Sequence, residues 1–199
     1  QEVMVGDDRQ KVAIQVEKQD AENGAPVAGA VFGIYNTEDL KNEKGEIIVK
    51  ADTLLQEMTS DNDGLAACTL DLPLGQYYVK ELKAPAGFVS SDEVLNLDAS
   101  YQGQDVKTVK LKTVKKNQPT TVEITKSDVT TGVELDGAKL TVLDKEGNVV
   151  DQWTSVKDQP HVIKRLTVGK EYTLREEIAP YGYCLLYTSD AADEGLGVD

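Results

Sequence analysis

Apolar and polar residues alternate with a period of two along several short stretches of the chain. Residues 12–16 read Val-Ala-Ile-Gln-Val, and residues 122–125 read Val-Glu-Ile-Thr. This spacing places successive side chains on opposite faces of an extended segment and is typical of half-buried strands. Turn signals such as Asp63-Gly64 and Glu146-Gly147 punctuate the short apolar runs. The pattern therefore predicts an all-β fold of the sandwich type.

Two blocks of sequence occur twice. Residues 16–30 and 124–138 share a Lys-x-Asp, a glycine and a Gly-Ala pair at the same spacing. Residues 77–88 and 172–183 share the pattern Tyr-x-x-x-Glu-x-x-Ala-Pro-x-Gly-aromatic. The repeat predicts two copies of one domain. The two blocks lie farther apart in the first copy than in the second, and we expect the extra residues to form an enlarged hairpin or loop in the polar stretch 37–60.

The repeat divides the chain into four segments. Because the chain starts at Gln1 and not at Met, we expect it to be a piece of a longer protein. The string from Cys184 to Glu194 resembles the translation of a sequencing adapter, so we expect a non-native read-through there. The segments are the end of a preceding domain or a linker (1–10), a first domain (11–118), a second, truncated domain (119–183) and the read-through (184–199).

Each copy directs one lysine and one glutamate toward its apolar interior. Lys18 continues the inward phase of residues 12–16, and Lys126 continues that of the second copy. Glu81 and Glu176 fall on the inward phase of their own strands. Burying a lone charge costs several kcal/mol, so such groups are paired, neutralised or used chemically. A lysine at a strand end can also extend its ammonium to water. Because both copies show the pattern, we favour a chemical role.

These residues belong to motifs that mark a known family. The Lys-x-Asp at 18–20, the Gly-Ala at 29–30 and the block 77–88, each repeated in the second copy, resemble the CnaB-type, SpaA-like domains of Gram-positive pilins and adhesins. The resemblance covers nearly all of residues 11–183. It implies tandem immunoglobulin-like, prealbumin-like β-sandwiches.

The resemblance also implies an internal isopeptide bond in the first domain. In this family a lysine of the first strand condenses with an Asn or Asp of the last strand, and a central glutamate moves the protons. Here these roles fall to Lys18 and Glu81, and family placement selects Asn117 as the acceptor. Asn96 and Asp98 are the alternative acceptors. Strand alternation is ambiguous near Asn117, because Lys115 would also point inward, and a bulge or strand end would explain this.

The second copy has Lys126 and Glu176 as the equivalent lysine and proton shuttle. The segment that would carry their acceptor is replaced by the suspected read-through. We therefore expect no native isopeptide bond in the second domain. We also expect an unpaired buried lysine and an exposed sheet edge to make this domain poorly stable.

Composition narrows the classes of partner. The chain has 35 acidic and 21 basic residues, and its net charge of −14 argues against nucleic-acid binding. No apolar run reaches the length of a membrane span, about 20 residues. The segment 61–64, Asp-Asn-Asp-Gly, lacks the other ligands of a calcium loop and predicts a simple turn, so we expect no metal or cofactor. With two cysteines and Cys184 suspected to be non-native, a disulfide framework is excluded.

The function that these features favour is structural. We expect a shaft segment of an extracellular, cell-wall-anchored pilin or adhesin, whose partners are neighbouring domains, pilus subunits or host surface ligands. The alternative is a ligand-binding adhesin module, in which Trp153 and His161 would be the candidate residues for ligand contact. An enzyme is not favoured, since the repeat places Glu81 and Glu176 in different domains, too far apart for a glycosidase carboxylate pair.

Overall fold

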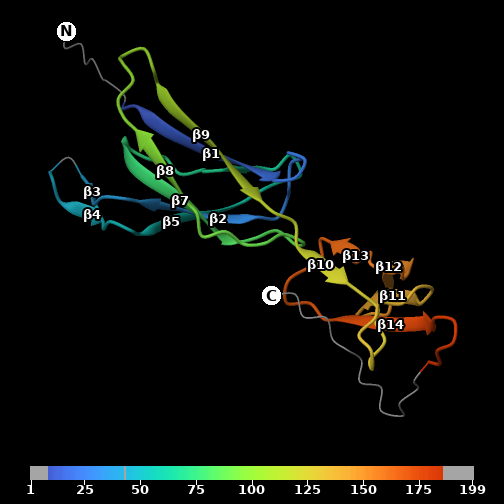
Figure 1. Cartoon of the computed structure of the whole chain (residues 1–199). Helices are drawn as coiled ribbons and strands as arrows, with labels where there is room; N and C mark the ends of the chain where they lie inside the picture. The colour runs from blue at the N-terminus through green and yellow to red at the C-terminus, as the bar shows by residue number, and fades with distance from the viewer. Residues whose placement is uncertain (1–8, 43, 186–199) are drawn as a thin grey trace, which may run out of the picture. The chain divides into compact units, whose positions relative to one another are not determined.

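A computed structural model of the chain describes residues 9–42 and 44–185, and all regular structure in this part is strand (Figure 1). The chain divides into two compact units, with the boundary between Gln118 and Pro119. The short segment Ala86–Phe88 belongs to the second unit. Over the described residues we find no helix with the length and apolar character of a membrane span.

The first sheet of the first unit joins the two ends of its sequence. Its strands lie in the order β6 (Leu65–Ala67), β1 (Lys11–Asp20), β9 (Thr108–Asn117). β1 and β9 are parallel and stay in one register along their whole length. Because directly paired residues of parallel strands project to the same side, the inward residues of β1 and β9 form one continuous surface.

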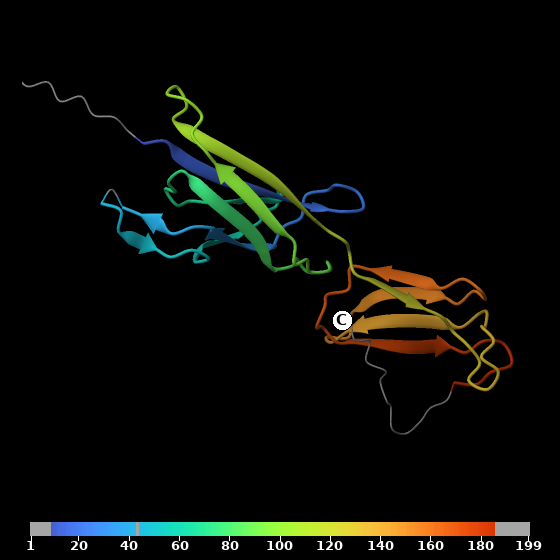
Figure 2. The ribbon, with the colours of Figure 1, turned by 60° about the vertical axis from the view of Figure 1, so that its left-hand side comes forward.

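The second sheet is antiparallel and faces the first across the core. Its order is β5 (Leu54–Thr59), β2 (Val31–Asn36), β7 (Gly75–Lys83), β8 (Val94–Ala99). Figures 1 and 2 show the two sheets of this unit as separate layers. The core between them comes from alternating inward positions of both sheets, including Val12, Ile14, Val16, Phe32, Ile34, Tyr77 and Val79. The all-β sandwich expected from the sequence is therefore confirmed.

The second unit repeats part of this plan. β10 (Thr121–Ile124) pairs with β13 (His161–Lys164), as β1 pairs with β6. The other sheet has the order β12 (Val149–Thr154), β11 (Lys139–Asp144), β14 (Tyr172–Ile178), which matches β5, β2 and β7. Strands corresponding to β8 and β9 do not occur among residues 119–185. Its core contains Val142, Ile163, Leu166 and Tyr172.

The extra length of the first copy lies in one connection. Residues 37–53 separate β2 from β5, whereas only residues 145–148 separate β11 from β12. This difference accounts for the whole extra length of the first copy. The longer connection contains a small hairpin of β3 (Leu40–Lys41) and β4 (Ile47–Val49), as the polar composition of this stretch predicts.

The tyrosine that opens each repeated block closes a local turn. Tyr77 is buried, and its hydroxyl donates a hydrogen bond to the carbonyl of Pro73 at 2.7 Å. Burial raises the pKa of Tyr77 to about 12. In the second unit, the hydroxyl of Tyr172 accepts a hydrogen bond from the backbone N–H of Thr167 at 2.9 Å. A phenol satisfies its polar atom in this way while its ring fills the core.

Gly64 supports the end of β1, and its replacement provides a test of the packing. Its φ is +73°, and a Cβ at this position would lie 2.5 Å from the carbonyl oxygen of Lys18. We expect Gly64→Ala to lower the free energy of unfolding of the first unit by about 3 kcal/mol or more, because left-handed strain adds to a backbone clash. Urea unfolding followed by circular dichroism measures the loss, while the fluorescence of Trp153 reports on the second unit.

Gly24→Ala is the matched control. Gly24 has the same φ of +73°, but a Cβ there meets no atom within 4 Å. This variant should therefore lose only the left-handed strain, about 1 kcal/mol. Equal losses in the two variants would contradict the predicted clash with Lys18.

Candidate functional site

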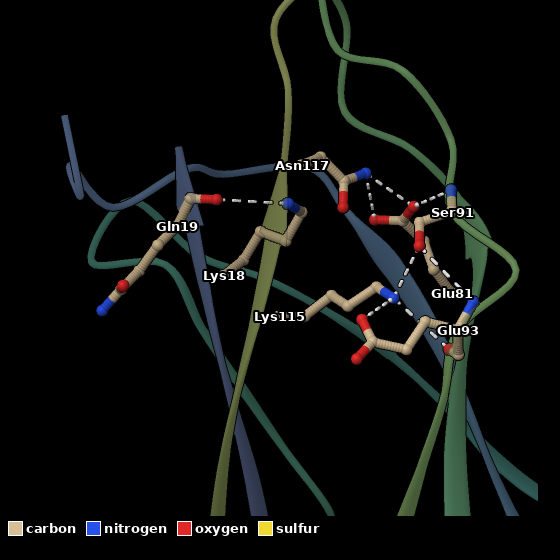
Figure 3. A network of polar contacts seen from close by, with 7 residues as sticks. All are labelled: Lys18, Gln19, Glu81, Ser91, Glu93, Lys115 and Asn117. Atoms are coloured by element: carbon tan, nitrogen blue, oxygen red, sulfur yellow. Dashed lines mark hydrogen bonds and ion pairs between the residues drawn. The ribbon is translucent and has the colours of Figure 1, made fainter. Parts of the chain in front are cut away.

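Three of the residues singled out in the sequence meet at one end of the first core. Lys18 and Asn117 are 0% and 2% exposed, and Glu81 is half-buried beside them. The amide Nδ2 of Asn117 donates to both carboxylate oxygens of Glu81, at 2.9 and 2.7 Å. Figure 3 shows the Lys18 and Asn117 side chains on the same side of their strands, with the Lys18 amine donating to the carbonyl of Gln19 at 3.4 Å. A buried amine, a buried carboxamide and a half-buried carboxylate are thus assembled at one end of the core.

The register of β1 and β9 brings the first two of these groups together. Lys18 pairs with Lys115, and Asp20 pairs with Asn117. Lys18 and Asn117 are therefore two positions apart on adjacent strands and project from the same face. The backbone N–H of Ala21 donates to the carbonyl of Asn117 at 3.0 Å, which fixes this end of the ladder.

A register shift accompanies Glu81 in the opposite sheet. Glu81 lies opposite Phe32, and the pairing of β2 with β7 shifts between Val31 and Phe32. The second unit has the same shift beside Glu176, between Lys139 and Leu140. A bulge bends the strand locally and redirects its side chains, and both copies have one next to the inward glutamate.

Burial changes the acidity of the Lys18 amine. Removal from water lowers the pKa of Lys18 from 10.5 to about 8. The negative charge of Glu81 raises this pKa in part, the positive charge of Lys115 lowers it, and Asp20 raises it. About one tenth of the amine is therefore neutral and nucleophilic at pH 7, far more than for an exposed lysine.

Asn117 also holds a buried polar atom without a partner. Its Oδ1 is inaccessible to solvent and accepts no hydrogen bond from the described residues. Such atoms are uncommon in folded proteins, because each costs about 1–3 kcal/mol, and they mark sites of strain or chemistry. The unpaired oxygen belongs to the carboxamide that projects from the same face as Lys18, two positions away on the adjacent strand.

Lys115 is a second buried lysine, on the inward phase that alternation gave it. No bulge occurs near it: β9 pairs regularly with β1 up to its end at Asn117, Val114 points outward and Lys115 is fully buried. The Nζ of Lys115 donates to Ser91 Oγ at 2.8 Å and forms an ion pair with Glu93 Oε2 at 2.7 Å. Alternation already placed Lys115 inward, but no sequence signal marked Ser91 and Glu93, because they lie in a connection.

The alternative acceptors lie elsewhere. Asn96 and Asp98 are exposed residues of β8, and their side chains alternate with the buried Leu97 and Ala99. Asp98 accepts a hydrogen bond from Gln76 at 2.7 Å on that outer face. Of the three acceptors weighed from the sequence, only Asn117 shares the core face with Lys18.

The equivalent pair of the second unit is more exposed. Lys126 Nζ and Glu176 Oε2 form an ion pair at 3.2 Å, with side chains 29% and 22% exposed. The expectation of an unpaired, buried Lys126 is therefore wrong, because without a counterpart of β9 among residues 119–185 the side chain reaches solvent. The buried Oε1 of Glu176 has no partner in the described part. Most of the suspected read-through, residues 186–199, lies outside the described residues.

The two other features noted in the sequence, the Trp153 and His161 pair and the segment 61–64, make local packing and turn contacts. Trp153 packs against the second core, and its ring stacks on that of His161 at 4.1 Å. His161 Nε2 lies 2.8 Å from Asp151 Oδ2. Asp61 Oδ1 accepts two backbone hydrogen bonds, both 2.9 Å, from Asp63 and Leu65, as a turn requires. The described residues contain no cluster of three side chains that could hold a metal ion.

Comparison with known proteins places the chain. The family model described as a SpaA prealbumin-like fold domain matches residues 12–115 and again residues 120–191. The chain belongs to this family. The resemblance noted in the sequence is thus confirmed, and because the domains of this family are structural, so is the expectation of a protein that is not an enzyme.

Individual relatives are Gram-positive surface proteins. The trypsin-resistant surface T6 protein of Streptococcus pyogenes is 30% identical over 95 residues, which are 48% of this chain and 15% of that protein. The Bacillus anthracis TIE protein has a TM-score of 0.56 at 26% identity, over 96% of this chain and 32% of that chain. A C-terminal fragment of the pilus adhesin SpaC from Lactobacillus rhamnosus GG has a TM-score of 0.47 at 17% identity, over 88% of this chain and 78% of that chain. The SpaA-like chain thus spans only a minor part of the first two relatives.

The depressed pKa of Lys18 predicts how pH affects the fold without any covalent link. In an Asn117→Ala background, Lys18→Met should raise the free energy of unfolding at pH 7 by about 3 kcal/mol, because methionine has no charge to remove from water. Below pH 8 the penalty of Lys18 is fully present, and it fades as pH rises from about 8 to 10.5.

Urea unfolding across pH 6 to 11 measures this difference. The advantage of methionine should shrink steadily above pH 8. Lys112→Met is the matched control, since Lys112 lies on the outer face of β9 and pairs with Glu17. A constant advantage of Lys18→Met at every pH would contradict the depressed pKa.

Proposed function

We propose that this chain is a shaft segment of a Gram-positive surface protein, and that its first domain forms an internal isopeptide bond between Lys18 and Asn117. The observation that carries the proposal is the buried meeting of Lys18, Asn117 and Glu81 between the first and last strands. Membership of the SpaA-like family and one relative named as a surface protein support the structural role.

The three groups suit a condensation that uses no external reagent. The neutral Lys18 amine attacks Cγ of Asn117, forming a Nζ–Cγ bond, and the Cγ–Nδ2 bond then breaks. Glu81 takes a proton from the attacking nitrogen and delivers it to Nδ2, which leaves as ammonia. Rotation of the amide about Cβ–Cγ would bring the unpaired Oδ1 to Glu81, where the carboxyl that has just taken the proton can donate a hydrogen bond to the developing oxyanion. Each site reacts once.

The bond would stabilise the domain in two ways. It closes a loop of about 100 residues between Lys18 and Asn117, which in the chain-entropy model of a crosslink contributes about 4.7 kcal/mol. It also joins the first strand to the last strand of the domain, β1 to β9. Tension along the chain would then load a covalent bond before it loads the hydrogen bonds between strands, as a shaft requires.

We expect one crosslink in this chain. In the second unit Lys126 and Glu176 form the corresponding pair, and no strand among residues 119–185 takes the place of β9 to present an acceptor. The domain acts with its neighbours in the same chain, at the cell surface outside the cell. Pilus subunits and host surface ligands are the external partners that this role implies.

Mass spectrometry of the intact, denatured chain tests the bond. Condensation of Lys18 with Asn117 releases ammonia, so the wild-type chain should be lighter than its sequence mass by about 17 Da. Glu81→Ala removes the proton carrier and should have the full mass. Peptide mapping should place the link between residues 18 and 117.

A full wild-type mass would contradict the crosslink but leave the family and the fold in place. The alternative, a ligand-binding module, would then gain weight, and a binding screen against glycans and matrix proteins would examine it. The stacking of Trp153 on His161 and against the core does not favour that alternative.

A further inference from the structure

Lys115 is a second lysine inside the first core, and the crosslinking chemistry does not use it. Lys18 and Lys115 pair directly across the parallel strands β1 and β9, and both are 0% exposed. Adjacent strands are about 4.8 Å apart, so the two side chains start side by side on one face. Two like charges in an apolar interior lower the stability of the fold. The direct pairing of two buried lysines therefore suggests a role for Lys115 in the chemistry of Lys18.

The charge of Lys115 is held in place by the connection that precedes β8. Its Nζ contacts Ser91 Oγ at 2.8 Å, Glu93 Oε2 at 2.7 Å and the carbonyl of Glu93 at 3.3 Å. The Glu93 side chain is 63% exposed, so its carboxylate stays solvated while it anchors the ammonium. Lys115 is thus a fixed cation at the wall of the site.

The same connection reaches the proton carrier. The backbone N–H of Ser91 donates to Glu81 Oε2 at 3.2 Å, and Glu81 accepts two hydrogen bonds from Asn117. Ser91 therefore lies between Lys115 and Glu81, as Figure 3 shows. These contacts of Ser91 and Glu93 hold the Lys115 ammonium in a fixed position near Glu81.

We propose that Lys115 is a positioning residue for the crosslink, whose fixed positive charge increases the share of the neighbouring Lys18 amine that is neutral and nucleophilic. This inference rests on the proposed function. Burial is the largest influence on the Lys18 amine and favours its neutral form. Among the charged neighbours, Glu81 from β7 and Asp20 from β1 favour the protonated amine, Lys115 from β9 disfavours it, and Glu93 is the counter-charge of Lys115. Without Lys115 the two carboxylates would be unopposed by a nearby cation, and a smaller share of the amine would be neutral.

The test uses two variants that break the same ion pair, Lys115 with Glu93, but change the local charge in opposite directions. It therefore separates an effect of charge from an effect of packing. Lys115→Met removes the cation, and Glu93→Gln removes its counter-charge while leaving the interior intact. Full-length chains are isolated unfolded in urea, refolded at pH 6, where the Lys18 amine is protonated, and moved to a series of higher pH values by rapid mixing. Mass spectrometry follows the loss of about 17 Da, and circular dichroism confirms that each variant has folded before mixing.

The two substitutions should shift the pH profile of the rate in opposite directions. Lys115→Met should move the midpoint upward by about one pH unit, which makes the reaction about tenfold slower at pH 7 and restores the wild-type rate at high pH. Glu93→Gln should move the midpoint downward, because Lys115 is then less screened. Lys112→Met, on the outer face of the same strand, should leave the profile unchanged.

A merely structural role of Lys115 gives a different result. Both variants break the same ion pair, so they would then slow the reaction together and by the same factor at every pH, which would overturn the inference. If Lys115→Met does not fold, Glu93→Gln alone decides, since an upward shift or a uniform loss contradicts the charge effect. A wild-type chain that keeps its full mass would overturn the proposed crosslink itself, and this inference with it.

Discussion

The parallel pairing of β1 with β9 is the constraint on which the first domain depends. It joins strands from opposite ends of the domain in one uninterrupted register, from Lys11 with Thr108 to Asp20 with Asn117. One half of this shared face is apolar and closes the core. The other half presents Lys18, Lys115 and Asn117 to the interior. Because paired residues project to the same side, a shift of one residue would expose the apolar half and the polar half together.

This polar end destabilises the domain before any bond forms. It buries an amine whose pKa is depressed, a second ammonium and an unpaired amide oxygen. Each of these groups opposes folding, and the ion pair of Lys115 with Glu93 and the hydrogen bonds of Asn117 to Glu81 offset only part of the cost. On the proposed function, condensation converts the most costly group, the amine of Lys18, into a neutral amide. The strain of the precursor is then part of the driving force.

The sequence predicts most of this arrangement, and the failures have physical causes. Alternation and the repeat locate the strands, the insertion between β2 and β5, and the inward directions of Lys18 and Glu81. Alternation also placed Lys115 inward, but a bulge is the more frequent explanation for a charge in that position. Glu93 lies in a connection, where side-chain direction has no period to follow. The exposure of Lys126 follows from the lack of a strand beside it among the described residues 119–185, which local pattern does not indicate.

The contrast between the two lysine–glutamate pairs shows what β9 contributes. Lys18 lies under a paired strand and is fully buried, whereas Lys126 has no such strand beside it among the described residues and is 29% exposed. β9 removes water from the Lys18 amine, carries the acceptor Asn117 and brings the cation Lys115 into the same register. On the proposed function, one pairing event activates the nucleophile and delivers the electrophile together. A chain that has not yet paired its ends lacks both, so the reaction waits for the correct fold.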